Sequence, residues 1–173
     1  MNRITSTSRG RLLPHAFLSL LLLVSLVPVS VGFAAQAQVA DSSRRLYDRV
    51  MEEFRHKDYE AALEGFKLFL EIHGQSALAA NAQYWIGECQ YRTGRYKDAL
   101  ASFYNVISYY PLSQKHAAST LKIGQIYVKQ GDREKANLMF ERVTDQYPDS
   151  TEADVARKAL EAAGAKNEAI APE

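Results

Sequence analysis

The sequence lacks most of the groups that cross-link small domains. It contains one cysteine, Cys89, among 173 residues, which excludes an intramolecular disulfide framework and any metal site built from several cysteines. With nine glycines and five prolines, the composition is neither collagenous nor disordered. Basic and acidic residues number 21 and 20, so charge-driven binding of nucleic acid is not expected. This length suffices for about one folded domain.

Catalytic and metal-binding patterns are also missing. His15, His56, His73 and His116 lie far apart, and none pairs with another histidine or with Cys89 at ligand spacing. The sequence has no glycine-rich phosphate loop, and its carboxylates are scattered over polar segments that cannot create an acid/base pair. We therefore expect no enzyme activity, no cofactor and no metal. Cys89 is expected to be a small buried side chain, although an exposed Cys89 could form an intermolecular disulfide.

The N-terminal segment has the three-part layout of a secretory signal. Residues 1–11 contain three arginines, residues 16–27 are apolar apart from two serines, and Ala35 and Ala37 supply the small side chains that a signal peptidase needs. The apolar run is short for a membrane span of about 20 residues. We predict cleavage after Ala37, which leaves an exported protein without a stable membrane span; a retained membrane anchor is the alternative. No cysteine follows this cleavage site, so a lipid anchor is not expected.

From Leu46 onward the sequence repeats with a period of 37 residues, which is typical of stacked repeat units. The three rows begin at Leu46, Gln83 and Thr120. Three columns are identical in all rows: Ala62, Ala99 and Ala136; Phe66, Phe103 and Phe140; Ser76, Ser113 and Ser150. Further columns agree in the last two rows, among them Gly87 with Gly124, Gly94 with Gly131, and Pro111 with Pro148.

Each row predicts two helices. In the second row, Ser76 is expected to cap a first helix that ends near Arg92 and Gly94. A second helix is expected from Tyr96 to Tyr109, because Pro111 cannot continue it. Its apolar residues recur at helical spacing on one face. In the third row, Asp132 is the expected cap of the second helix, and Ala136, Phe140 and Val143 are expected on its buried face.

Small residues indicate how these helix pairs stack. Gly87 and Gly124 lie in first helices, where a glycine costs about 1 kcal/mol relative to alanine, so we expect close helix contacts at both positions. Phe103 and Phe140, in the second helices, can fill the space between neighbours. A seventh helix over residues 151–163 is expected to cap the stack with Ala153, Val155, Ala156, Ala159 and Leu160 as its apolar residues.

The repeated residues resemble the tetratricopeptide pattern. The first row departs from it, since Val50 and Lys57 replace the two glycines and Gly74 replaces the proline. The resemblance implies an all-α fold, a right-handed superhelix of three tetratricopeptide helix pairs plus a C-terminal capping helix. The residues assigned structural roles are Gly87, Gly94, Ala99, Phe103, Pro111, Gly124, Gly131, Ala136, Phe140 and Pro148. The expected boundaries are a signal peptide at 1–37, a repeat domain at 38–163 with repeats at about 46–82, 83–119 and 120–156, and a flexible tail at 164–173.

The linkers after Pro111 and Pro148 and the segment 79–88 are similar to the C-terminal domain of the Tol–Pal-associated CpoB (YbgF) family, over roughly residues 43–162. This resemblance implies a periplasmic adaptor that coordinates envelope constriction and division, with Tol–Pal components or a peptidoglycan synthase as partners. Family members commonly carry a trimerising coiled coil before the repeats, and residues 38–42 leave no room for one here. The outer-membrane assembly lipoprotein BamD has similar long repeats, which implies the alternative of a periplasmic chaperone or scaffold.

The resemblance also places the partner-binding groove on the first helices. Tyr84, Glu88 and Tyr91 share one helical face, and aromatic side chains often anchor protein interfaces. These aromatic residues could instead pack mainly between helices, and both interpretations stay open at this point. A clamp for a C-terminal carboxylate is not expected, because Tyr47 and Met51 occupy the first clamp position. The candidate partner-binding residues are Tyr47, Met51, Phe54, Asn81, Tyr84, Glu88, Tyr91, Arg92, Leu121, Gln125, Val128 and Lys129.

Overall fold

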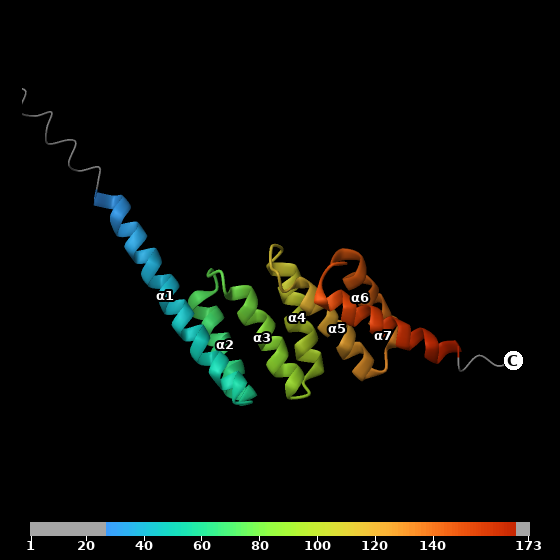
Figure 1. Ribbon diagram of the computed structural model, residues 1–173. Coiled ribbons are helices and arrows are strands. Elements are labelled where there is room, and N and C mark those ends of the chain that lie inside the picture. The colour runs from blue at the N-terminus through green and yellow to red at the C-terminus, as the bar shows by residue number, and fades with distance from the viewer. Residues whose placement is uncertain (1–26, 169–173) are drawn as a thin grey trace, which may run out of the picture. The chain divides into compact units, whose positions relative to one another are not determined.

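The computed structural model describes residues 27–168, and every regular element within them is a helix (Figure 1). This confirms the all-α prediction. In chain order the helices are α1 (Val27–Arg55), α2 (Tyr59–His73), α3 (Ala79–Arg92), α4 (Tyr96–Tyr109), α5 (His116–Gln130), α6 (Arg133–Gln146) and α7 (Thr151–Glu168). No helix of this described range is both long and apolar enough to cross a membrane.

The chain divides into two compact units, Met1–Ala40 and Asp41–Glu173. The described residues of the first unit, 27–40, are helical. Nearly all of the predicted signal, including its basic start and its apolar run up to residue 26, lies outside the described residues. The second unit contains the remainder of α1 and all of α2 to α7, and it forms the helix-pair domain described below.

In the second unit, helices that follow one another in sequence pack side by side from α2 to α7, and α7 also contacts α5 (Figure 1). Three apolar clusters form the core, and each combines one helix pair with the first helix of the next pair. Phe66, Phe103 and Phe140, the repeated phenylalanines, are almost completely buried and lie in successive clusters. Sharing a first helix between clusters makes the core continuous along the stack.

The predicted close contacts at the helix glycines are present. A Cβ atom added to Gly87 would lie 2.7 Å from Cε1 of Phe103, and one added to Gly124 would lie 2.6 Å from Cε1 of Phe140. The phenylalanine of each second helix therefore packs directly on the bare backbone of its first helix. In the first row this arrangement is exchanged between the helices: Val50 stands in the glycine column of α1, and its methyl groups pack on Gly65 of α2 at 2.7–2.8 Å from the added Cβ.

The turn that ends each first helix is the same in all three rows. Gly94 and Gly131 adopt left-handed φ angles of 77° and 79°, and Lys57 adopts 65°. In each case the residue that follows donates its backbone N–H to the carbonyl of the residue five positions earlier, from Asp58 to Glu53 at 3.0 Å in the first row. The first row is therefore a genuine repeat, although a lysine in this conformation costs about 1 kcal/mol more than glycine.

Several helix ends match their predictions, and others differ. The Asp132 side chain accepts the Lys135 N–H at 3.1 Å and caps α6 as predicted, and α4 has its predicted bounds. Ser76 does not cap α3, because its hydroxyl accepts the Leu78 N–H at 3.2 Å in the turn before the helix. The 37-residue period is three residues longer than the 34 residues of the tetratricopeptide pattern, and this turn precedes α3, which begins at Ala79.

The two terminal helices are longer than the sequence pattern indicates. The first helix of the first row was expected after residue 42, but α1 begins at Val27. The cap helix α7, expected over residues 151–163, continues through Gly164 to Glu168. Alanines around Gly164 favour helix and offset the cost of one glycine. On α7, Ala153 and Ala156 are buried as predicted, whereas Val155 is exposed.

We predict that Gly87→Ala lowers the free energy of unfolding by about 1–2 kcal/mol. The new methyl group collides with the buried Phe103 ring, an overpacking cost of roughly 1–3 kcal/mol that exceeds the gain in helix propensity. The matched control is Gly164→Ala in α7, where no atom lies within 4 Å of the added Cβ; it should be neutral or stabilising by up to about 1 kcal/mol. Urea denaturation of both variants measures the difference, and equal effects would contradict the packing role.

Candidate protein-binding surface

The twelve candidate residues form what we call the first-helix surface, contributed by α1, α3 and α5. Three of them are buried rather than accessible: Tyr84, Glu88 and Leu121 expose 8%, 3% and 7% of their surface. For these three, direct contact with a partner is not supported by the structure. The half-buried members are Tyr47, Met51, Phe54, Asn81, Tyr91 and Gln125, and the exposed members are Arg92, Val128 and Lys129.

Burial of these residues follows from how successive first helices interlock. Trp85 and Lys122 occupy the same column of the repeat alignment, which we call the contact column. Trp85 packs against Phe54 of the preceding first helix with ring centroids 4.7 Å apart, and its Nε1 donates a hydrogen bond of 2.8 Å to the Tyr47 hydroxyl. The first interface, between α1 and α3, is therefore aromatic.

The second interface, between α3 and α5, uses the same positions with ionic chemistry. Nζ of Lys122 lies 2.7 Å from Oε1 of Glu88 and 5.0 Å from the centroid of the Tyr91 ring. Arg92 adds a weaker contact, with Nε 3.8 Å from Oε2 of Glu88. Because Lys122 covers Glu88, a residue predicted to contact a partner instead joins two repeats.

Tyr84 belongs to the same buried polar group. Its hydroxyl donates to Oε1 of Glu88 at 3.5 Å, and its ring packs against Phe103 at 5.5 Å between centroids. Burial, and then the Glu88 carboxylate, raise the pKa of Tyr84 far above its usual value. Lys115 of the α4–α5 linker lies over the ring, 4.9 Å from its centroid. Tyr84 is therefore an interior residue, as one of the two open interpretations proposed.

The accessible part of the first-helix surface is small and basic. Arg92 and Lys129 are exposed next to half-buried Tyr91 and Gln125 and exposed Val128. Glu88, the one carboxylate among the twelve residues, is paired with Lys122. The surface can thus offer positive charge, an aromatic edge and an amide to a protein segment.

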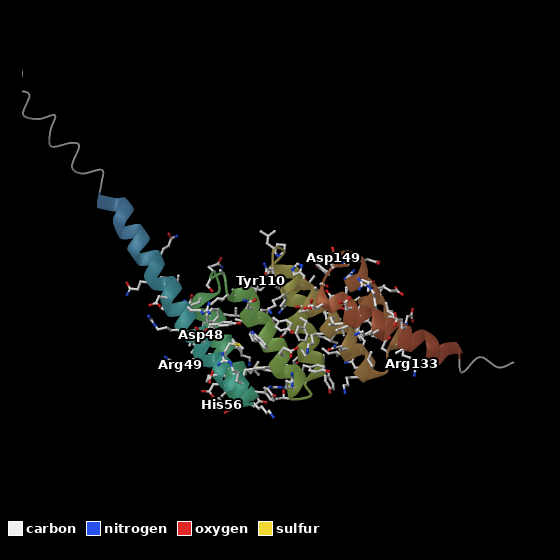
Figure 2. All side chains as sticks on the ribbon, in the orientation of Figure 1. Asp48, Arg49, His56, Tyr110, Arg133 and Asp149 are labelled. Atoms are coloured by element: carbon white, nitrogen blue, oxygen red, sulfur yellow. The ribbon has the colours of Figure 1, made fainter. Side chains whose placement is uncertain are left out.

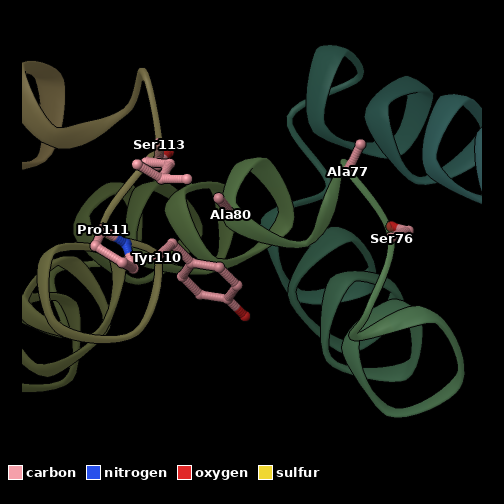
Figure 3. A pocket seen from close by; sticks show the side chains of 7 residues that line it. Ser76, Ala77, Ala80, Tyr110, Pro111 and Ser113 are labelled. Atoms are coloured by element: carbon pink, nitrogen blue, oxygen red, sulfur yellow. The ribbon is translucent and has the colours of Figure 1, made fainter.

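Sequence reasoning missed the role of Lys122, although its alignment with Trp85 in the repeat was a signal that could have found it. It also missed an apolar edge formed by the linkers (Figure 3). A pocket of about 280 Å³ is lined there by Ser76, Ala77 and Ala80 and by Tyr110, Pro111, Leu112 and Ser113. Leu112, one of these lining residues, exposes 98% of its surface.

Cys89 is fully buried in the first core cluster, as predicted. Burial, and then the neighbouring Glu88 charge, raise the pKa of its thiol to about 12. Within residues 27–168, no group of three histidine, cysteine, aspartate or glutamate side chains is placed to hold a metal ion. His116 makes a structural contact, with Nε2 2.8 Å from the Tyr110 carbonyl oxygen.

Stacked helix pairs joined through their first helices define the class of helical-repeat interaction domains. Residues 78–149 match the family model for the tetratricopeptide repeat, and the fold agrees. Residues 78–149 are therefore similar to the tetratricopeptide repeat, and the helix pairs on either side of them continue the same fold.

Three known proteins show the range of the similarity. Tetratricopeptide repeat protein 1 of Schizosaccharomyces pombe is 29% identical over 113 residues, which cover 65% of this chain and 11% of that protein. Cell division coordinator CpoB of Pseudomonas putida is 33% identical over 63 residues, 35% of this chain and 24% of that protein. The Yersinia enterocolitica type III secretion chaperone SycD, in complex with a peptide of the translocator YopD, aligns with a TM-score of 0.63 at 16% identity, covering 74% of this chain and 96% of SycD. The chain thus spans 11% and 24% of the length of these two sequence relatives.

We predict that Lys122→Met lowers the free energy of unfolding by roughly 3 kcal/mol, because it removes the close cation from the buried Glu88 carboxylate and leaves only the longer Arg92 and Tyr84 contacts. The double variant Glu88→Met with Lys122→Trp copies the residues of the first interface, Met51 and Trp85. It should recover most of this loss, since apolar replacement of a buried ion pair is often neutral or stabilising. Urea denaturation of Glu88→Met, Lys122→Trp and the double variant tests the coupling, and simple additivity would contradict it.

We predict that Cys89 is inert to a thiol reagent such as dithionitrobenzoate at pH 8 and reacts fully in concentrated urea, because the folded thiol is protonated and covered. Lys129→Cys supplies an exposed thiol as the control. The folded pKa lies above the ordinary value of 9.0, so the stability that the neutral thiol contributes is present below pH 9.0 and decreases as the pH rises toward 12. Rapid native reaction at pH 8 would contradict its burial.

Proposed function

We propose that the chain is an exported, non-catalytic adaptor that binds a protein of the bacterial envelope through the accessible part of the first-helix surface. The observation that carries this proposal is the placement of Arg92, Tyr91 and Lys129 on adjoining first helices of a tetratricopeptide-repeat domain. Aromatic and arginine side chains are the residues that most often dominate binding energy. Arg92 and Lys129 are both basic and exposed, which favours a partner segment that carries carboxylates.

The location and the pathway belong to the same proposal. The signal-like segment before residue 38 supports export to the periplasm, and the similarity to cell division coordinator CpoB supports a role in Tol–Pal-linked envelope constriction and division. A Tol–Pal component or a peptidoglycan synthase is the expected partner. Cleavage after Ala37 would keep the α1 residues that pack in the helix-pair domain, among them Tyr47, Val50 and Phe54.

A chaperone for outer-membrane proteins in transit is the second candidate. It is favoured by the likeness in fold to SycD, a secretion chaperone whose structure includes a translocator peptide. The two functions differ in their partners, because an adaptor binds one stoichiometric protein whereas a chaperone binds many unfolded chains.

The test is photo-crosslinking in cells from an unnatural amino acid at Lys129, followed by mass spectrometry of the adducts. The adaptor hypothesis expects one dominant adduct, a Tol–Pal component or a peptidoglycan synthase. The matched control places the same amino acid at Leu138, which is exposed on α6, and it should give no such adduct. A mixture of nascent outer-membrane proteins from Lys129 would favour the chaperone, and identical adducts from both positions would contradict the surface assignment.

Charge reversal provides an independent measurement. We predict that Lys129→Glu weakens binding of the captured partner at least about tenfold, equivalent to 1.4 kcal/mol, with little change in melting temperature because the Lys129 side chain is exposed. Lys97→Glu, at an exposed position of α4, changes the net charge by the same amount and is the control. Unchanged affinity of the Lys129→Glu variant, measured by titration calorimetry, would exclude this surface as the binding site.

A further inference from the structure

The third interface between repeats differs from the first two in the size of its contact residues. Continuing the 37-residue alignment places Ala159 of α7 in the contact column after Trp85 and Lys122. The residue it faces on the preceding first helix is Val128, in the column of Phe54 and Tyr91. Two small side chains thus replace the large pairs Trp85–Phe54 and Lys122–Tyr91.

Burial along α7 confirms that this register applies. Ala82, Ser119 and Ala156 share one column, and each is fully buried. Three residues earlier on two of these helices, Ala79 and Ala153 also share a column and are buried. The cap helix α7 therefore docks on α5 as a first helix would, and Ala159 stands where a larger side chain fills the two earlier interfaces.

The missing volume is present as a pocket. An opening of about 320 Å³ lies between α5, α6 and α7, and its lining includes Val128, Ala136, Asn137, Phe140, Ala159 and Ala163. We call it the open contact pocket. Its size lies at the lower end of the range typical of ligand-binding clefts, about 300–1,000 Å³. Because exposed Val128 belongs both to its lining and to the first-helix surface, the pocket continues that surface.

The charges around the pocket indicate what it can receive. Arg133, the first residue of α6, also lines it (labelled in Figure 2), and no carboxylate of the described residues lies within ion-pair distance of its guanidinium. In the second interface the cation of Lys122 is accommodated because it pairs with Glu88. In the third interface the uncharged Gln125 occupies the column of Glu88. A cation would therefore meet Arg133 without a compensating acid, whereas an aromatic side chain would find apolar walls of the kind that Trp85 finds.

We propose that the open contact pocket receives an aromatic side chain of a partner protein, from a segment that carries a carboxylate beside the aromatic residue. The aromatic side chain of the partner takes the place in the third interface that Trp85 takes in the first interface. The carboxylate of the partner pairs with Arg133. This inference rests on the proposed adaptor function, and it adds a specific anchor to the basic surface described above.

The test is a nuclear magnetic resonance titration of the ¹⁵N-labelled chain with the probe N-acetyl-tryptophyl-aspartate amide. Saturable changes in chemical shift are expected at the backbone amides of Val128, Arg133 and Ala159. The control probe N-acetyl-alanyl-aspartate amide, which lacks the aromatic ring, should cause none of these changes. Ala159→Trp should abolish the shifts by filling the pocket from inside, whereas Val155→Trp, on an exposed position of the same helix, should leave them. Absence of localised shifts in the unaltered chain, or unchanged shifts in Ala159→Trp, would overturn the proposal.

A second variant keeps the test valid if Ala159→Trp fails to fold. Arg133→Gln alters an exposed side chain and should weaken binding of the aspartate probe several-fold without changing binding of the matching asparagine probe. Equal effects on both probes would exclude the carboxylate pairing. Sedimentation at the concentrations of the titration must show a monomer, because a dimer that Ala159→Trp dissociates would assign the pocket to a second copy and overturn the proposal.

Cellular capture separates this inference from the adaptor function. If crosslinking from Lys129 yields one partner and Ala159→Trp reduces the yield several-fold, both are supported. If the yield is unchanged, the adaptor function stands and the pocket proposal fails. If Lys129 captures no partner at all, the adaptor function fails, and the titration with the purified chain decides the pocket by itself.

Discussion

The packing of a phenylalanine ring on the bare backbone of a neighbouring helix sets the spacing on which the domain depends. At Gly87 and Gly124 there is no room for even a methyl group, so each second helix lies as close to its first helix as the ring allows. Dispersion contacts of this density fix one arrangement of the pair. The exchange of Val50 and Gly65 in the first row keeps the same close approach with the small and large residues on opposite helices.

Once each pair is fixed, the interfaces between pairs are free to differ in chemistry. The contact column shows three solutions: Trp85 on aromatic residues, Lys122 on a buried carboxylate, and Ala159 with a space beside it. The first two solutions remove side chains from the surface and strengthen the stack. The third leaves apolar walls accessible near the cap helix. The residues of the first-helix surface that a partner can reach are therefore those that the interfaces between repeats leave exposed.

Much of the fold could be predicted from the sequence because its signals are local. The bounds of α4, the cap at Asp132 and the left-handed turns at Gly94 and Gly131 depend on residues within one or two turns of each other. Ser76 was misread because a three-residue linker insertion is not distinguishable from a cap by residue type alone. The turn at Lys57 could not be recognised, since lysine carries no preference for a positive φ.

The sequence by itself determined the class, the period, the helix pairs and their buried faces, because apolar periodicity and turn residues encode helices directly. Only the tertiary structure decided which residues of the candidate surface a partner can reach. Tyr84, Glu88 and Leu121 have the helical spacing of a surface face, and they are buried because the next repeat covers them. That covering depends on contacts between residues a full repeat apart, such as Glu88 with Lys122. A pattern within one helix does not contain this information.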